Sequence, residues 1–467
     1  MKTIKPKINR TNYNKFDFDK ILPIAILLLI VSGIFISYSK KFDIDEIEAM
    51  HTAWKILMGE KIYIDFFQHH HSLFYYLLMP IITIFGETAK SLIYARLYFY
   101  AIFLLIVYIT YKIASIDNNK RISLISVILL LSFTLFSYKA VEIRPDLPQI
   151  ALILLAIYHF LLYLRNNSIK TLIISAISLG LAFLILQKTV FVIAIIGLIQ
   201  LYYLIKKEIS KKSFLLFWIT FLITIFPYYF YLLLTNNLST YFTFNWLINM
   251  EGSSQFSPIQ NLKNSYHQNT IHWIFYFIAI LFIPKNTYIK FMIIVSVALI
   301  LLLFLVNAPY LQYFIIITPF VSILSAKSMH TLFKNNIPIL YFILLLSIIP
   351  YFFEFQKTHN NKNDIKRLQY VLDNTNKNDK VFDGLSYINL YRKDIDFFWF
   401  SVYEHGLLEI YQNMTNYHYD IYELIDRYKP KVIFAHTINN MNHKNIKPYY
   451  YQSIQYPRIY IRKTNIN

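Results

Sequence analysis

Residues 43–71 read DIDEIEAMHTAWKILMGEKIYIDFFQHHH and lie between two apolar runs, at 21–38 and 92–113. The stretch holds six acidic side chains and four histidines, whereas each flanking run is long enough to cross a hydrocarbon core of about 30 Å. Its aromatic side chains, among them Trp54 and Phe67, are of the kind that gathers at a membrane interface. The pattern predicts a long first extracytoplasmic loop, over residues 40–90, that lies on the membrane surface.

The composition indicates a membrane protein. Of the 467 residues, 56% are hydrophobic and 15% are charged, which excludes a disordered chain and an ordinary cytosolic enzyme. The net charge of +19 would suggest nucleic acid in a soluble protein, but the basic residues lie mainly between apolar runs, as in cytoplasmic loops. We therefore expect no nucleic-acid partner. The chain has no cysteine, so it has no disulfide and no thiolate metal site.

Apolar runs of roughly 17 residues predict about eleven membrane spans. Lys and Arg recur in every second short loop between these runs, so the N-terminal tail is expected in the cytoplasm and the residues after Phe353 outside. The runs lie at 21–38, 92–113, 122–137, 147–164, 171–187, 189–205, 213–234, 270–284, 291–306, 310–326 and 337–353.

The last segment of the chain, residues 354–467, is polar and has its own periodic pattern. We expect helices at 362–374 and 421–428, and strands that begin at Lys380 and Lys431. The fold prediction is therefore mainly α: a polytopic membrane helix bundle in residues 1–353, followed by a small extracytoplasmic α/β domain large enough to bury its own core.

The first loop carries the first candidate site. If it is helical, Asp45, Glu48 and His51 would share one face, at spacings of three residues. The run His69-His70-His71 could bind a divalent metal together with Asp45 or Asp65, or bind phosphate, or only pack. A solvated juxtamembrane helix is the plainer alternative for the whole loop.

The second candidate site is the very short outside turn between the third and fourth spans, with Glu142, Arg144 and Asp146. Ionisable residues at this depth are costly and usually paired, so they indicate a functional site unless an ion pair merely fixes the turn. Lys188 stands alone between two apolar spans, where it suits a lipid phosphate or reaches towards the interface.

Two further positions extend this pattern. Tyr313 belongs to a turn, residues 307–313, that places hydroxyl and amide groups near the membrane surface. Arg96 lies within the second span and needs an anionic partner, which a phosphate or an acidic side chain would supply equally well. The chain contains no P-loop, no GxSxG, no HExxH and no dinucleotide fingerprint.

The pair Asp45-Glu46, the run GEKIYIDFF at 59–67 and His69-His70 resemble the first periplasmic loop of polytopic glycosyltransferases with the C-type fold. That family includes the dolichyl-phosphate-mannose protein mannosyltransferases and the bacterial lipid A aminoarabinose transferases. The resemblance is densest over residues 43–100 and looser around Arg144-Pro145-Asp146, Lys188 and the polar C-terminal segment. One departure is Gln68-His69-His70-His71, where members often have a proline and a basic residue.

The resemblance implies an inverting sugar transfer from a polyprenyl-phosphate donor at the extracytoplasmic face of a membrane, here expected to be a bacterial plasma membrane. It implies Asp45 as the base or acceptor-positioning residue, supported by Glu46 and Asp146. A base must lie within hydrogen-bond reach of the acceptor hydroxyl, and a departing phosphate needs positive charge. The expected substrate-binding residues are Asp65, His69, His70, Arg96, Glu142, Arg144, Lys188 and Tyr313.

Other functions compete with this interpretation. A transporter or lipid flippase could also use intramembrane charges, but transporters commonly show repeated halves and Gly- or Pro-broken helices, and this sequence shows neither. An O-antigen ligase or polymerase would have a different large outer loop. The acceptor stays open between a glycan, a lipid and a protein, and the need for a metal stays open as well.

Overall fold

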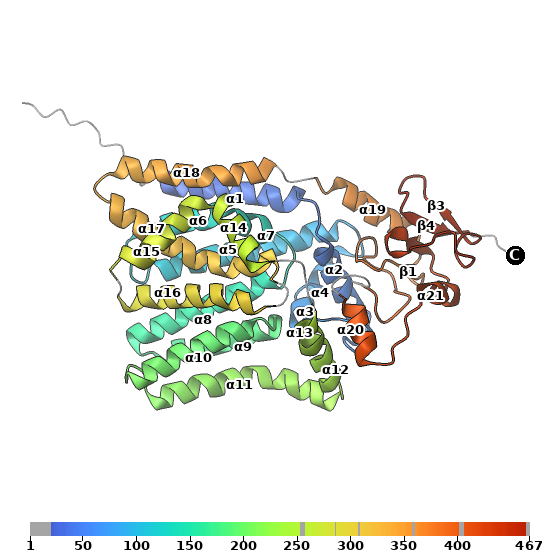
Figure 1. Ribbon diagram of the computed structural model, residues 1–467, viewed down its shortest axis with the longest axis horizontal. Coiled ribbons are helices and arrows are strands. Elements are labelled where there is room, and N and C mark those ends of the chain that lie inside the picture. Colours follow the sequence, from blue (N-terminus) through green and yellow to red (C-terminus); the bar gives the residue numbers. More distant parts are fainter. Residues whose placement is uncertain are drawn as a thin grey trace, which may run out of the picture.

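The computed structural model describes residues 20–252, 257–284, 286–306, 309–356, 360–400 and 406–463. The N-terminal tail, predicted to be cytoplasmic, lies outside these residues. The described chain forms a bundle of roughly parallel helices, with a smaller part that contains a sheet at one end of the bundle (Figure 1).

Every apolar run of the sequence has become a helix of the bundle. These helices are α1 (Ile21–Ser39), α5 (Ser91–Ala114), α6 (Lys120–Ser132), α8 (Asp146–Asn166), α9 (Ile169–Ile185), α10 (Thr189–Ile205), α11 (Lys211–Leu234), α15 (Thr270–Phe282), α16 (Thr287–Leu302), α17 (Thr318–Phe333) and α18 (Ile337–Gln356). The predicted mainly helical, polytopic fold is confirmed.

Seven helical segments of the described chain are long and apolar enough to cross a membrane, so the chain is an integral membrane protein. Helices α9, α10 and α15 are apolar but shorter, and α6 has only 13 residues. Helix α6 ends early because Phe133 takes an extended backbone conformation, after which α7 (Thr134–Lys139) continues the run. The number of spans, predicted as about eleven, therefore stays a prediction.

The first long loop folds into α2 (Ile44–Leu57), α3 (Leu73–Tyr76) and α4 (Met79–Phe85). Helix α2 begins with a capping box, in which the Asp43 side chain accepts the Asp45 N–H and Glu46 Oε2 accepts the Asp43 N–H. This capping places the carboxyl groups of residues 43–48 at the end of the bundle rather than in a mobile loop.

The GEKIYIDFF run forms a tight turn. Tyr63 has a positive φ of 69°, a conformation that L side chains rarely adopt, and Asp65 accepts the Lys61 N–H at 2.7 Å. The turn buries Phe66 and Phe67 completely. Phe67 stacks on Phe398, with ring centroids 4.1 Å apart. The motif therefore joins the first loop to the C-terminal part of the chain.

The second long loop, after α11, contains α12 (Leu238–Phe242), a π-helical turn (Thr243–Leu247), α13 (Ile248–Glu251) and α14 (Pro258–Gln268). Short 3-10 segments, Leu303–Leu305 and Leu311–Ile317, follow α16 and precede α17. Apolar side chains of the second loop share one core cluster with Phe67, Phe398 and helix α20 (Leu407–Met414).

The C-terminal part contains a four-stranded sheet of order β1-β2-β4-β3 (Figure 1). Its elements are α19 (Lys362–Asp373), β1 (Val381–Phe382), α21 (Ile421–Tyr428), β2 (Val432–Phe434), β3 (Tyr450–Gln452) and β4 (Ile459–Arg462). Strands β1 and β2 are parallel, whereas β4 pairs with β2 and β3 in antiparallel fashion. Ile433 packs in one apolar cluster and Val432 and Phe434 in another, so both faces of the sheet are covered.

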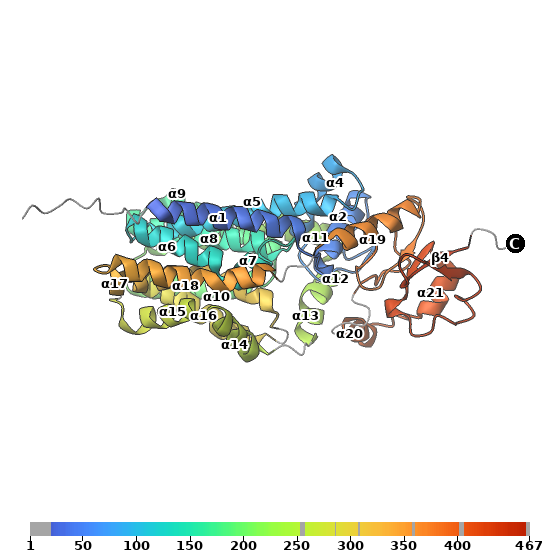
Figure 2. The same cartoon turned by 90° about the horizontal axis from the view of Figure 1, so that it is seen from above.

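Helix α2 lies where the bundle meets the C-terminal part (Figure 2). His51 Nε2 is 2.9 Å from Asp394 Oδ2, and Lys55 Nζ is 2.7 Å from the same atom. The Trp399 indole N–H donates to the Phe67 carbonyl at 3.0 Å. These contacts hold the C-terminal part against the loop that carries the first acidic cluster.

Candidate active site

A cavity of about 1420 Å³ lies at the end of the bundle beside α2. Its walls come from segments far apart in the sequence: α2, the histidine run, the turn before α8, the turn before α10, α13, the segment after α16, and residues of the C-terminal part. The predicted site residues that line it are Asp45, His69, His70, Arg144, Asp146, Lys188 and Tyr313.

Arg144 is the centre of the charged wall. Its guanidinium lies 2.5 Å from Asp45 Oδ2, 3.1 Å from Glu142 Oε2, 3.7 Å from Asp146 Oδ2 and 3.8 Å from Asp43 Oδ2. The Arg144 side chain is only 5% exposed. One buried cation thus bridges the two acidic clusters that the sequence places about 100 residues apart.

Glu142 holds Arg144 in place and does not itself line the cavity. Its carboxylate is 1% exposed and contacts Lys40, Lys139 at 3.2 Å and Arg144 at 3.1 Å. Burial alone would raise the pKa of this carboxyl, but the three cations hold the pKa well below its usual range. Glu142 therefore stays ionised as a fixed counter-charge behind the cavity wall.

Asp45 and Glu48 present carboxyl groups to the cavity from successive turns of α2. The Asp45 side chain is 49% exposed to the cavity. The protein around the cavity still shields its carboxyl from bulk solvent, and this desolvation raises the pKa of Asp45, whereas Arg144 acts to lower it. Glu48 is buried and accepts hydrogen bonds from Thr52 at 3.0 Å and from Gln68. Burial and the nearby Asp45 raise the pKa of Glu48 to about 7.

The prediction that His51 would share this face is wrong. His51 points to the C-terminal part, where Nδ1 contacts the Leu390 carbonyl and Nε2 contacts Asp394. An α-helix turns about 100° per residue, so a spacing of six residues rotates the side chain by roughly 120° away from Asp45. Two residues at a spacing of three lie on the same face of a helix, but a third residue three positions further on does not.

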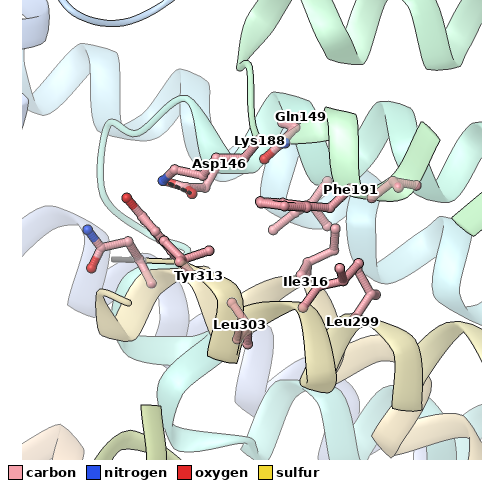
Figure 3. Close-up of a pocket in the computed structure, with 13 residues that line it drawn as sticks. Asp146, Gln149, Lys188, Phe191, Leu299, Leu303, Tyr313 and Ile316 are labelled. Atoms are coloured by element: carbon pink, nitrogen blue, oxygen red, sulfur yellow. Dashed lines mark ion pairs between the residues drawn. The ribbon is translucent and has the colours of Figure 1, made fainter. Parts of the chain in front are cut away.

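A second, apolar cavity of about 50 Å³ adjoins the charged one (Figure 3). Asp146, Lys188 and Tyr313 line both cavities. Lys188 Nζ lies 3.8 Å from Asp146 Oδ1 and 3.2 Å from the centre of the Tyr313 ring, which gives the ammonium a cation–π contact. Apart from Gln149 and Gln312, the rest of the wall is apolar, with Ile150, Phe191, Val192, Leu299, Leu303 and Ile316 among its residues.

Besides Glu142, three predicted residues do not line either cavity. Glu46 and Arg96 form a fully buried ion pair with each other, Nη2 to Oε2 at 2.5 Å. Arg96 thus has an acidic side chain as its anionic partner, one of the two possibilities left open by the sequence. Asp65 is exposed and accepts the Lys61 N–H inside the turn. Glu46, Arg96 and Asp65 shape the scaffold around the site.

His70 supplies hydrogen-bonding groups rather than charge. Burial, followed by the neighbouring His69, lowers the pKa of His70 well below its usual value, so its ring is neutral near pH 7. The backbone N–H groups of His69 and His70 both donate to Gln68 Oε1, at 2.8 and 3.3 Å, which aims the Gln68 amide at Glu48. The described residues include no group of three or more histidine and acidic side chains placed to hold a metal ion.

Known proteins share this architecture. Residues 69–233 match the family model of the dolichyl-phosphate-mannose-protein mannosyltransferases, a range that includes Arg96, Arg144, Asp146 and Lys188 but not Asp45. The apo structure of ArnT from Cupriavidus metallidurans matches with a TM-score of 0.62 at 12% identity, over 80% of this chain and 85% of ArnT.

Two further structures agree with this match. The apo oligosaccharyltransferase of Archaeoglobus fulgidus matches with a TM-score of 0.60 at 11% identity, over 97% of this chain and 75% of that protein. ArnT bound to undecaprenyl phosphate matches with a TM-score of 0.55 at 15% identity, over 68% of this chain. This chain has the C-type glycosyltransferase fold.

The resemblance seen in the sequence is thereby confirmed at the level of the fold. The chain spans 62% of the length of ArnT in its undecaprenyl-phosphate complex. No curated protein matches the chain significantly.

Two parts of the candidate site were not predicted from the sequence. Lys40, the first residue of the predicted loop, was not singled out, yet it contacts Glu142 behind the cavity wall. A lysine at the outer flank of a span departs from the positive-inside rule, which was a usable signal. Leu385 and Ser386 line the cavity from the C-terminal part, and no motif in that polar segment marks them.

Proposed function

We propose that this chain is a membrane glycosyltransferase that moves a sugar from a polyprenyl-phosphate donor to an acceptor hydroxyl, with inversion at the sugar C1. The proposed location is the extracytoplasmic face of a bacterial plasma membrane. The observation that carries the proposal is the junction of the two cavities at Lys188 and Tyr313. A charged cavity next to an apolar cavity suits a substrate that is a sugar phosphate at one end and a hydrocarbon at the other.

The donor would lie across this junction. Its phosphate would contact Lys188, which lines both cavities, and Arg144, which lines the charged one. Its first prenyl units would lie among Phe191, Leu299 and Ile316. Charge-assisted contacts favour phosphate over neutral ligands, and the apolar wall favours a hydrocarbon chain.

The acceptor hydroxyl would bind beside Asp45. In the reaction, the hydroxyl oxygen bonds to the sugar C1 while its proton moves to the Asp45 carboxylate, and the bond from C1 to the phosphate oxygen breaks. The electron pair leaves with the phosphate, where Arg144 and Lys188 stabilise the additional charge. A direct displacement from the opposite side of the ring inverts C1.

The ion pairs suit these roles. Glu142 fixes Arg144 from behind, so the guanidinium is oriented before substrate arrives. Asp45 is exposed to the cavity, whereas Glu142 is not, so Asp45 is the one of these two partners of Arg144 that a substrate can reach. Asp146 lies between Arg144 and Lys188 and sets the spacing of the two cations.

The decisive experiment compares the glycans and lipids of the cell envelope, by mass spectrometry, in cells with the gene, without it, and with Asp45→Asn in its place. We expect one sugar to be missing in the last two strains. In vitro, the purified protein should release free polyprenyl phosphate from a lipid-linked sugar and ignore nucleotide sugars. Turnover with a nucleotide sugar, in the absence of carrier lipid, would contradict the proposal.

A further inference from the structure

The ion pairs around Arg144 form one neutral network. Contacts between 2.5 and 3.8 Å, together with the shorter pair of Lys40 and Glu142, link four cations to four carboxylates. The members are Lys40, Lys139, Arg144, Lys188, Asp43, Asp45, Glu142 and Asp146. An anionic phosphate that enters this network gains little unless one carboxylate moves away.

The four carboxylates differ in their freedom to move. Glu142 is 1% exposed and contacts three cations, and Asp146 is 7% exposed. Asp43 is 29% exposed and caps α2, where it accepts the Asp45 N–H and contacts Lys139 at 3.0 Å. Asp45 is the most exposed of the four at 49%, and its carboxyl already opens onto the cavity.

We propose that the donor phosphate and the Asp45 carboxylate compete for the guanidinium of Arg144, so that donor binding itself releases the base. This inference rests on the proposed function. Arg144 stays in place because Glu142 holds its other edge at 3.1 Å. Asp45 rotates into the cavity, towards the position where the acceptor hydroxyl would bind.

Replacement of the Asp45 carboxylate by the donor phosphate at Arg144 would raise the basicity of Asp45 when the donor binds. While Asp45 is paired with Arg144, the cation stabilises the ionised carboxylate and so reduces the basicity that burial would give it. Once a phosphate neutralises the guanidinium, this stabilisation is lost and the carboxylate binds a proton more readily. The acceptor would therefore be activated only when a donor is present, which favours an order of binding with the donor first.

The same competition would assist product release. After transfer, Asp45 carries the acceptor proton and is neutral, so it does not compete with the polyprenyl phosphate product for Arg144. When that proton is lost to water, the carboxylate regains its attraction to the guanidinium. The restored ion pair would then displace the product phosphate.

The test measures the dissociation constant of undecaprenyl phosphate from the full-length purified protein at pH 7. The variants are Asp45→Asn and Asp45→Ala, each in the wild-type and in the Arg144→Gln background, with Asp373→Asn on the exposed face of α19 as the matched control. We expect either Asp45 variant to bind the lipid roughly fivefold more tightly or better, the lower end of a typical coupling between two sites. A merely structural role of Asp45 would not tighten binding.

The double variants assign the gain to Arg144. The gain should disappear in the Arg144→Gln background, because the competition needs the guanidinium. An equal gain in both backgrounds would indicate loss of a nearby negative charge and would overturn the inference, as would unchanged or weaker binding by both Asp45 variants. If the wild-type protein does not bind undecaprenyl phosphate at all, the proposed lipid donor fails instead, and this inference fails with it.

Discussion

The Arg96 guanidinium and the Glu46 carboxylate are both fully buried and meet through two contacts, Nη2 to Oε2 at 2.5 Å and Nε to Oε1 at 2.7 Å. Arg96 also donates to the carbonyl of Lys41 at 2.9 Å, and Glu46 accepts the Ile143 N–H at 3.0 Å. The pair therefore joins the end of α1, helix α2, helix α5 and the turn before α8. It holds together the segments that carry Asp45 and Arg144.

Removal of one partner of this pair should destabilise the protein. Glu46→Gln or Arg96→Met alone leaves the other charge buried and unpaired, a change that costs roughly 3–5 kcal/mol in buried pairs. We expect a markedly lower midpoint of thermal unfolding in detergent for each single variant, and a smaller loss for the double variant. Unfolding midpoints equal to that of the wild type would show that the pair does not hold the scaffold.

Asp45→Asn should abolish most of the transfer while the protein stays folded. The amide has the size of the carboxyl but cannot accept the acceptor proton, and loss of a general base typically costs roughly 10²-fold or more in rate. The amount of product per cell, normalised to the amount of membrane protein, measures this. Asp65→Asn, in the turn outside the cavity, serves as the matched control and should retain transfer. Near-normal transfer by Asp45→Asn would remove Asp45 from the base role.

Lys188→Ala should weaken binding of the lipid phosphate roughly tenfold, the usual effect of losing a charged hydrogen-bond donor. Tyr313→Phe should bind like the wild type, because the ring that contacts the ammonium remains. Tyr313→Leu should lie between the two, since it removes the cation–π contact but leaves the charge. Binding of undecaprenyl phosphate to the three purified variants measures this order. A larger loss in Tyr313→Phe than in Tyr313→Leu would contradict the role assigned to the ring.

Glu48 should make the protein less stable as the pH rises. The folded-state pKa of Glu48 is about 7, above the ordinary value of 4.5, so the folded state binds the proton more tightly than the unfolded state. The free energy of unfolding should therefore fall as the pH rises from about 4.5 to about 7. Thermal unfolding of the wild type and of Glu48→Gln across this range measures the difference. The variant should show a flatter dependence, and an identical slope would exclude Glu48 as the source.

The topology predicts that the C-terminal part lies outside the cytoplasm. A reporter that is active only outside the cytoplasm, fused after residue 360, should give a signal, because an odd number of spans follows a cytoplasmic N-terminus. A cytoplasmic reporter at the same position is the matched control and should be silent. The opposite result would place the cavity on the cytoplasmic face and remove the reason for a lipid-linked donor.

Local patterns were sufficient for the membrane helices and for part of the C-terminal segment. The apolar runs became helices because each needs only its own backbone hydrogen bonds inside a membrane. The expected helix at 421–428 and the strand near Lys431 appear as α21 and β2. Helix α20 and strands β3 and β4 were not predicted, since they are short, and the two strands rely on neighbours from distant parts of the chain for their hydrogen bonds.

The sequence by itself determined that the chain is a helical membrane protein, and it indicated which polar clusters carry the chemistry, because composition and periodicity are local properties. Only the tertiary structure decided which of those charged residues stabilise the scaffold and which line the cavity. Arg96 and Glu46 neutralise each other inside the scaffold, whereas Arg144 meets Asp45 at the cavity. Both pairs join residues at least 50 positions apart. Which carboxylate faces which cation depends on how the helices pack, and no pattern within a single segment specifies that.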